Sequence, residues 1–176
     1  MAQVTYQIDP VHSGAHFSVR HMMISNVRGE FTKVSGKILW DSENPANSSI
    51  EAGIDATSIN TREPQRDGHL KSPDFLDVEQ YPEIQFRSTQ VHSTEGGVEV
   101  TGDLTIHGVT RSVVLEVEGP TPENRDPWGY VRIGASATTK IDRRDFGLIW
   151  NSALETGGVL VGDQVKISIE VEGVRQ

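Results

Sequence analysis

Apolar and polar residues alternate along most of this chain, so that nearly every second side chain in long stretches is apolar. Such alternation predicts β-strands that each have one buried face and one exposed face. The segment Ser25–Phe31 is ambiguous, because Gly29 suggests a bend or a bulge within it. The clearer strands, about eight or nine in number at the spacing of a sandwich or barrel, are Val4–Asp9, Ala15–Arg20, Val34–Trp40, Ile50–Thr57, Ile84–Val91, Val98–Ile106, Val109–Glu118, Val131–Ile141 and Val165–Glu172.

Short turn signals join several of these strands. Glu95-Gly96-Gly97 and His107-Gly108 each separate two alternating runs, and Gly108 readily adopts the positive φ that a two-residue hairpin turn requires. Strands that are joined by such short turns run antiparallel. The chain has 176 residues and no repeat or break in composition, so we expect one domain spanning residues 1–176. The expected fold class is therefore all-β, with an antiparallel sheet.

One segment, Ser58–Pro82, lacks the alternation and predicts a short helical insert between two strands. Pro64 suits the first turn of a helix, where a missing N–H costs little. Ser72-Pro73-Asp74 is a clearer helix start, because it combines a serine cap, a proline and an acidic residue. Tyr81-Pro82 ends the segment, since the residue before a proline is disfavoured in the α region. Such an insert either plugs one end of a barrel or covers a cavity. A second irregular stretch, Asp145–Asp163, precedes the last strand.

Several inward positions of the predicted strands hold small residues. A barrel of about eight strands is just wide enough to be filled by side chains or to hold one small ligand. The small residues favour an unfilled apolar lumen, but they also suit a barrel whose taper or neighbouring aromatic rings take up the space. The sequence leaves both interpretations open. A lumen of this kind would be lined by hydrocarbon and would take a largely apolar ligand. The small residues are Ala52, Ala56, Gly102, Ala135 and Ala137.

The charge and the cysteine content exclude several classes of protein. The formal net charge of −9 argues against a nucleic-acid partner and against adsorption to an anionic membrane, because both need a clustered positive face. The absence of cysteine excludes disulfides, thiolate metal sites and cysteine nucleophiles. No apolar run approaches the roughly 20 residues of a membrane span, so we expect no stable membrane insertion. The first residues enter a strand without a basic start or an apolar run, so we expect no signal peptide in the chain as given. We expect a soluble cytoplasmic protein, or a periplasmic or secreted one if a leader has been removed.

The candidate catalytic and metal-binding residues form no known motif. The chain has no G-x-S-x-G elbow, phosphate-binding loop or HExxH pair, so we predict no catalytic residue, no metal and no cofactor. A metal site would require the long-range assembly of His12, His69 and His107 with an aspartate. The alternative of an enzyme that acts on a hydrophobic substrate would use His69 or His12 with Asp67 or Asp142.

Two polar clusters each place a guanidinium group beside a carboxylate. They are Arg66-Asp67-Gly68-His69 in the insert and Asp142-Arg143-Arg144-Asp145-Phe146-Gly147 after a strand. One interpretation is a network of arginine–carboxylate pairs that fastens the insert and the loop to the barrel rim. The other is that the clusters gate the mouth of a lumen or bind the polar end of a ligand. We favour the fastening role.

A set of ordered motifs extends this interpretation over almost the whole chain. In combination, these motifs resemble the YceI-like family of bacterial polyisoprenoid-binding proteins. The motifs are Asp9-Pro10-Val11-His12-Ser13, Phe17-Ser18-Val19-Arg20-His21, Ser58-Ile59-Asn60-Thr61, Arg66-Asp67-Gly68-His69-Leu70, Phe75 with Tyr81-Pro82, Gly102-Asp103-Leu104-Thr105-Ile106-His107-Gly108-Val109-Thr110, and Asp142-Arg143 with Asp145-Phe146-Gly147.

The resemblance implies an extended, lipocalin-like antiparallel β-barrel that holds a long isoprenoid or fatty chain in a hydrophobic tunnel. Homodimers are common in that family. We therefore expect non-enzymatic binding, transport or storage of a long apolar chain. The alternatives are the enzyme described above and a structural, stress-related module with a filled barrel. The residues expected to line the tunnel, including Leu70 and Phe75 from the insert, are Phe17, Val19, Ile38, Ile54, Leu70, Phe75, Phe86, Leu104, Ile106, Leu115, Ile133 and Ile167.

Overall fold

The structure is a computed structural model that describes residues 3–155 and 157–176. Its one α-helix within those ranges is α1 (Pro64–Lys71), and four short 3-10 helices are η1 (Pro10–His12), η2 (Pro45–Asn47), η3 (Ala56–Ser58) and η4 (Arg143–Phe146). The strands are β1 (Gln3–Ile8), β2 (Gly14–His21), β3 (Ser25–Phe31), β4 (Val34–Asp41), β5 (Ser49–Asp55), β6 (Ile59–Asn60), β7 (Glu83–Thr94), β8 (Gly97–Ile106), β9 (Val109–Glu118), β10 (Asn124–Arg125), β11 (Val131–Asp142) and β12 (Val161–Arg175).

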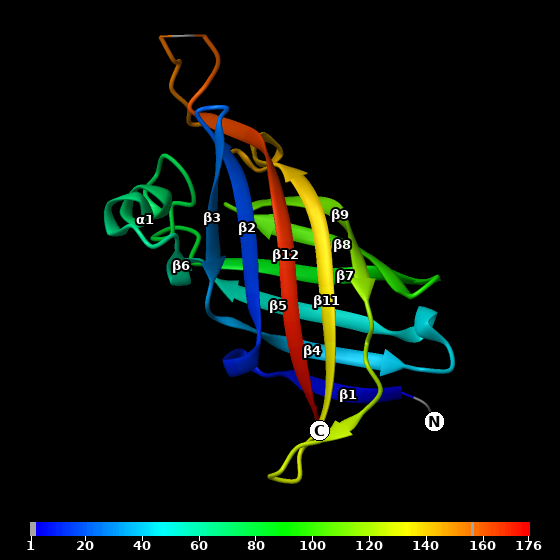
Figure 1. Ribbon diagram of the computed structural model, residues 1–176. Coiled ribbons are helices and arrows are strands. Elements are labelled where there is room, and N and C mark those ends of the chain that lie inside the picture. Colours follow the sequence, from blue (N-terminus) through cyan, green and yellow to red (C-terminus); the bar gives the residue numbers. More distant parts are fainter. Residues whose placement is uncertain (1–2, 156) are drawn as a thin grey trace.

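The sheet closes into a barrel of eight antiparallel strands, in the order β11-β9-β8-β7-β5-β4-β1-β12. The closing pair is β11 with β12, whose register runs from Arg132 opposite Val174 to Asp142 opposite Gln164. On its other edge, β12 pairs first with β2 and then, near its C-terminal end, with β1. Figure 1 shows β2 and β3 beside β12, with α1 next to β3 and β6. The predicted all-β, lipocalin-like barrel with a helical insert is confirmed.

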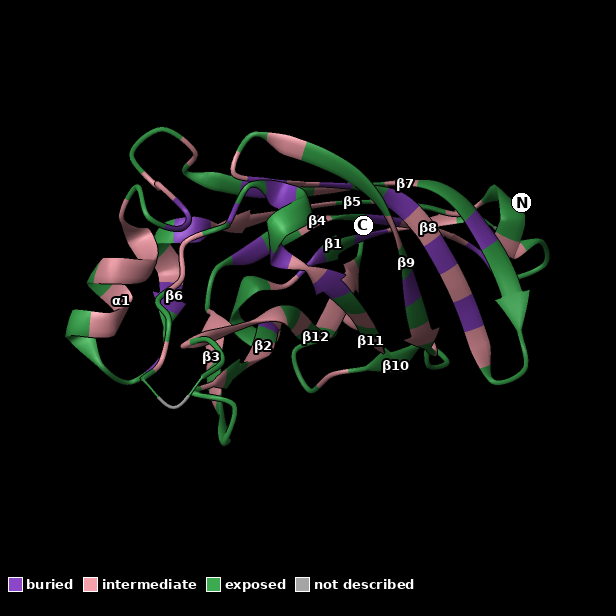
Figure 2. Ribbon diagram, turned by 90° about the horizontal axis from the view of Figure 1, so that it is seen from above, coloured by how far each residue is buried: buried purple, intermediate pink, exposed green. Residues whose placement is uncertain are grey.

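The predicted strands are all present, with ends that differ by at most four residues. Two strands of only two residues each, β6 and β10, were missed because two residues cannot display an alternation. The strand β12 begins earlier than predicted, at Val161, where a register shift before Val165 interrupts its pairing with β2. Figure 2 shows the alternation most clearly along β8, whose inward residues are buried and whose other residues are more exposed.

The insert contains one helix rather than two. The prediction that Pro64 occupies the first turn is confirmed, and the Glu63 carboxylate accepts the Arg66 amide at the helix start. The prediction of a second helix from Ser72 is wrong, because the chain folds back over α1 in a series of turns. The amide of Leu76 donates to the Leu70 carbonyl at 2.9 Å. This folding back buries Leu76 to 8% exposure, a tertiary gain that overrides the local cap signal.

Two glycines make room for aromatic rings on neighbouring strands. Gly29 lies opposite Phe17 in an unbroken register between β2 and β3, so the expected bend or bulge is wrong. A Cβ atom at Gly29 would overlap the Phe17 ring, and a Cβ atom at Gly102 would overlap the Phe86 ring. Both glycines therefore provide space for a ring in the barrel wall, and only Gly102 lies beside a register shift, between Ser88 and Gln90 of β7. At His107-Gly108, by contrast, the predicted two-residue turn is confirmed, with φ of 56° and 72°.

Candidate functional site: an apolar cavity in the barrel

The inward faces of the strands enclose a cavity of about 680 Å³. Its lining is mostly aliphatic and aromatic, because period-two alternation turns every second side chain of each strand inward. Leu70 and Phe75 reach it from the insert. That these side chains contact a ligand stays a prediction. The lining includes every residue that the sequence singled out, namely Phe17, Val19, Ile38, Ile54, Leu70, Phe75, Phe86, Leu104, Ile106, Leu115, Ile133 and Ile167.

Small residues create part of this space. Ala52, Ala135 and Ala137 line the cavity, so at these positions the barrel is left unfilled. Ala56 instead lies within the packed core at 1% exposure, and the space beside Gly102 is taken up by Phe86. Both interpretations of the small residues are therefore correct, each at different positions. The cavity argues against the alternative of a structural module with a filled barrel.

One end of the cavity, here called the mouth, carries a group of charged and polar lining side chains. Arg20 and His21 come from β2, and Glu63, Arg66 and His69 come from the insert. Arg66 and Asp67 do not form the predicted arginine–carboxylate pair.

Instead, both side chains bind Thr61, the residue that follows β6. The Arg66 guanidinium donates to the Thr61 hydroxyl at 2.8 Å and to its carbonyl at 2.7 Å, and the Asp67 carboxylate accepts the Thr61 amide at 2.8 Å. The cluster therefore fastens α1 to the strand before it, as expected, but through a threonine, which no charge pattern indicates.

Three rings form the wall of the mouth. The ring centroids of His69 and Trp150 are 4.7 Å apart, and those of His69 and Phe75 are 5.1 Å apart, both edge-on. The His69 ring nitrogen Nε2 lies 2.9 Å from the Asp74 carboxylate. Sequence reasoning missed Trp150, because it lies in an irregular stretch where no periodicity assigns it a face.

Arg143 holds the irregular stretch that contains Trp150. The residue is only 3% exposed, and its guanidinium donates to four backbone carbonyls, those of Leu148, Trp150 (2.9 Å), Val161 (3.3 Å) and Gly162 (2.8 Å). Burial lowers the pKa of Arg143. The prediction that this cluster fastens a loop to the barrel holds for Arg143, but its hydrogen-bond acceptors are carbonyls, and the Asp163 carboxylate lies 3.7 Å away.

The neighbouring arginine makes the predicted pair with a carboxylate. Arg144 donates from Nε and Nη2 to the two oxygens of Asp142, at 3.0 and 2.7 Å. This pairing, together with the Arg144 backbone amide, lowers the pKa of Asp142 to about 2. Arg144 is far more exposed than Arg143, so the two adjacent arginines have different roles.

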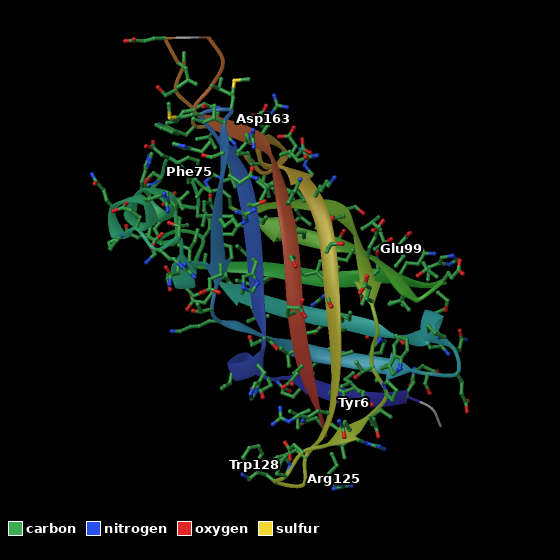
Figure 3. The ribbon with its side chains drawn as sticks, viewed as in Figure 1. Tyr6, Phe75, Glu99, Arg125, Trp128 and Asp163 are labelled. Carbon is green, nitrogen blue, oxygen red and sulfur yellow. The ribbon has the colours of Figure 1, made fainter. Side chains whose placement is uncertain are left out.

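Charged side chains join the strand ends at the opposite end of the barrel. Arg132 donates to Asp9 and to Asp126, both at 2.7 Å, and lies 3.4 Å from Glu172. Hydrogen bonds from His12 and Arg132 lower the pKa of Asp9 to about 2. These contacts join the ends of β1, β11 and β12, which are far apart in sequence. We call this side, including Tyr6 and its partners, the closed end (Figure 3).

A buried tyrosine extends the closed end. The Tyr6 hydroxyl donates to Glu123 at 2.6 Å, and Arg175 donates to both oxygens of the same carboxylate at 3.0 Å. Burial, with the adjacent carboxylate, raises the pKa of Tyr6 to about 12. Tyr6 is 2% exposed, so its ring belongs to the core while its hydroxyl is satisfied at the surface.

The residues considered as a metal site are not brought together in the described part of the chain. His12, His69 and His107 belong to no common ligand cluster there. The only potential cluster among the described residues joins Asp9, His12 and Glu172. Arg132 already neutralises these carboxylates, so the site's chemistry does not fit a further cation.

The structure does not form the histidine–aspartate pairs that the alternative of an enzyme requires. His69 is paired with Asp74 rather than Asp67, and His12 is paired with Asp9. Asp142 is held by Arg144. Within residues 3–155 and 157–176, the proposed histidine–aspartate pairs are therefore not brought together.

Among the same residues, no helix has the length and apolar character needed to cross a membrane.

A closed antiparallel barrel around an apolar cavity defines the class of barrel proteins that bind ligands in their interior. Residues 6–173 match the model of the YceI-like domain, so the chain belongs to the YceI-like family. A UPF0312 protein of Pseudomonas putida is 38% identical over 174 residues, which cover 97% of this chain and 86% of the relative. A UPF0312 protein of Vibrio cholerae is 34% identical, with 97% and 87% covered.

Solved structures share the fold. The Campylobacter jejuni YceI protein superimposes with a TM-score of 0.74 at 31% identity and covers 89% of this chain and 90% of that one. Burkholderia cenocepacia BcnA gives a TM-score of 0.79 at 22% identity, with 94% and 98% covered. A polyisoprenoid binding domain from Saccharophagus degradans gives 0.70 at 16% identity, with 98% and 99% covered.

Proposed function

We propose that this protein binds a long isoprenoid or other lipid chain in the barrel cavity and carries or stores it without chemical change. The observation that carries the proposal is the apolar cavity of about 680 Å³. Its volume falls in the range of roughly 300–1,000 Å³ that is typical of small-molecule sites. A cavity of this kind favours a hydrocarbon chain, because it offers few polar partners along its length.

The energetics of burial agree with such a cargo. Each methylene that leaves water for the cavity contributes about 0.8 kcal/mol, so a chain of many methylenes offsets the cost of its own ordering. Arg20, His21, Glu63, Arg66 and His69 line the mouth, where the polar end of a bound chain would meet them. Recognition would then depend mainly on the length and width of the chain.

The structural neighbours support the same class of ligand. The Saccharophagus degradans domain is named as a polyisoprenoid binding domain, and its barrel is superimposable on this one over nearly the whole chain. An isoprenoid is methyl-branched at regular intervals and therefore wider than a linear fatty chain. The small residues Ala52, Ala135 and Ala137 leave room for such branches within the lining.

Native mass spectrometry of protein purified without detergent tests the proposal. We expect an adduct whose mass matches a lipid, recovered by organic extraction. We also expect added geranylgeraniol, a C20 isoprenoid alcohol, to raise the melting temperature of the protein, because a ligand that binds only the folded state stabilises that state. An empty protein whose melting temperature is unaffected by geranylgeraniol and by oleic acid would contradict the proposal.

A further inference from the structure

The turn between β2 and β3 exposes large apolar side chains. Met22, Met23 and Ile24 are 41%, 58% and 74% exposed, and Val159 in the stretch before β12 is 40% exposed. We refer to these four residues as the apolar tip. Exposed apolar side chains that occur singly need no explanation, but four that gather at one end of a barrel do.

The backbone of the turn is unfavourable for the residues that it holds. Met22 and Met23 have φ of 51° and 63°, and the Ile24 amide donates to the His21 carbonyl at 3.1 Å. Three residues therefore separate His21 from its partner Ser25, and both central residues of the β-turn His21–Ile24 have positive φ, a conformation for which Asn-Gly is strongly preferred. Two methionines in the left-handed region cost stability that Asn-Gly would not, and about half of their side-chain surface remains exposed.

The apolar tip is one surface, although its residues come from two segments. The Met22 amide donates to the Leu160 carbonyl at 2.8 Å. The sulfur of Met23 packs directly on Gly158, where a Cβ atom would overlap it. Figure 1 shows the β2–β3 turn and the stretch before β12 together at the top of the view.

The apolar tip also borders the mouth of the cavity. Arg20 and His21, which precede Met22, line the cavity, and so do Leu160 and Val161, which follow Val159. An apolar chain that leaves or enters through this end would pass beside the tip. The exposed surface and the interior of the barrel are therefore adjacent along both segments.

We propose that the apolar tip inserts into the surface of an uncharged lipid bilayer and places the mouth of the cavity against it. Its role in cargo transfer rests on the function proposed above, because a long apolar chain exchanges with a membrane faster if it does not cross water. The four side chains of the tip carry no charge. Beside them, the Arg20 guanidinium donates to the Met23 carbonyl at 3.2 Å and Glu155 lies in the loop that holds Val159, so these two neighbouring charges are of opposite sign, while the whole protein has a net charge of −9. Bilayers without net charge are thus the fitting partner, and anionic ones are not.

The test compares the wild-type protein with the triple variant Met22→Asn, Met23→Gly, Ile24→Ser. The substitutions remove the apolar side chains but install the residues that this turn prefers, so the hairpin is retained. The control is Val11→Ser. Val11 is 83% exposed and lies before the start of β2, whereas the apolar tip follows the end of that strand.

Flotation with phosphatidylcholine vesicles in the absence of cargo measures docking alone. We expect the wild type and Val11→Ser to float with the vesicles, and the triple variant to lose at least about 10-fold of the bound fraction. Equal flotation of all three proteins, or no flotation of the wild type, overturns the proposal. Loss of self-association in the triple variant, measured by analytical ultracentrifugation, with unchanged flotation overturns it too and assigns the tip to a second copy of the chain.

Transfer of geranylgeraniol separates docking from cargo binding. We expect the triple variant to bind geranylgeraniol added from ethanol with wild-type affinity but to extract it from phosphatidylcholine vesicles at least about 10-fold more slowly. Equal extraction rates overturn the role of the tip in transfer and leave cargo binding intact. If no protein binds geranylgeraniol but flotation still depends on the tip, the docking proposal stands and the proposed function falls.

Discussion

The two ends of the barrel are held together by different kinds of interaction. At the closed end, ion pairs and charge-assisted hydrogen bonds join side chains from distant parts of the chain, as Arg132 does with Asp9 and Asp126. At the mouth, Arg143 binds backbone carbonyls of an irregular stretch, and the rings of His69 and Trp150 pack edge to face. Figure 3 places Tyr6 at one end and Phe75 and Asp163 at the other.

The interactions at the closed end hold the strands of the barrel together, whereas those at the mouth shape the entrance to the cavity. Charged pairs between strand ends fix the register in which β1, β11 and β12 meet. The mouth has no regular strand pairing to rely on over the stretch before β12, so a buried guanidinium organises the backbone instead. The predictions below test whether stability and ligand exchange divide between the two ends in the same way.

The largest effect is expected for Arg143→Ala at the mouth. The substitution leaves several backbone carbonyls without their donor, and we expect it to lower the free energy of unfolding by about 3 kcal/mol. Urea unfolding measures the loss, and ligand release should become faster. The matched control is Arg144→Ala, whose guanidinium is exposed and should change stability little. Equal losses for the two adjacent arginines would contradict the role assigned to Arg143.

A smaller effect is expected for Asp9→Asn at the closed end. The pKa of Asp9 lies at about 2, below its ordinary value of 3.8, so its contribution is present above pH 3.8 and is lost as the pH falls toward 2. We expect a loss of about 2 kcal/mol at neutral pH and a flatter dependence of stability on pH across that interval. Urea unfolding at a series of pH values measures both.

Ligand affinity distinguishes the closed end from the mouth in the same variant. Affinity for geranylgeraniol should be unchanged in Asp9→Asn, because Asp9 does not line the cavity. A change in affinity as large as that caused by Arg143→Ala would break the proposed division between the two ends.

The smallest effect is expected for Tyr6→Phe, which removes one hydroxyl and keeps the buried ring. Glu123 retains its pair with Arg175, so we expect a loss of about 1 kcal/mol near neutral pH. Because the folded pKa of about 12 exceeds the ordinary value of 10, this contribution is present below pH 10 and is lost as the pH rises toward 12. Thermal unfolding between those pH values should show the dependence in the wild type and not in the variant.

The sequence predicted those features of the molecule that depend on repeated local patterns. Alternation located the strands and their inward faces, because burial of one face is the same requirement at every strand. It therefore predicted the cavity lining from Phe17 in β2 to Ile167 in β12, and the turn at His107-Gly108 followed from the φ that glycine permits. These inferences needed no knowledge of which strands are neighbours.

Features that depend on single long-range contacts could not be predicted in this way. Thr61 binds both Arg66 and Asp67 only because β6 brings it to the helix start, and β6 has two residues. No periodic pattern surrounds Trp150. The partners of Arg143 are backbone carbonyls, which every residue has, so the sequence does not indicate which of them Arg143 binds. Ser72 satisfies every local rule for a helix start, but burial of the following residues decides the fold there.

The affinity of the cavity for geranylgeraniol tests the central claim most directly when Ala135→Phe is compared with Thr138→Phe. Both residues lie on β11, but Ala135 lines the cavity and Thr138 is exposed. Isothermal titration should show at least about 10-fold weaker binding for Ala135→Phe, because its ring occupies the space of the ligand, and wild-type affinity for Thr138→Phe. Equal affinities for the two folded variants, or no binding by the wild type, would contradict the claim that the barrel interior holds the apolar chain.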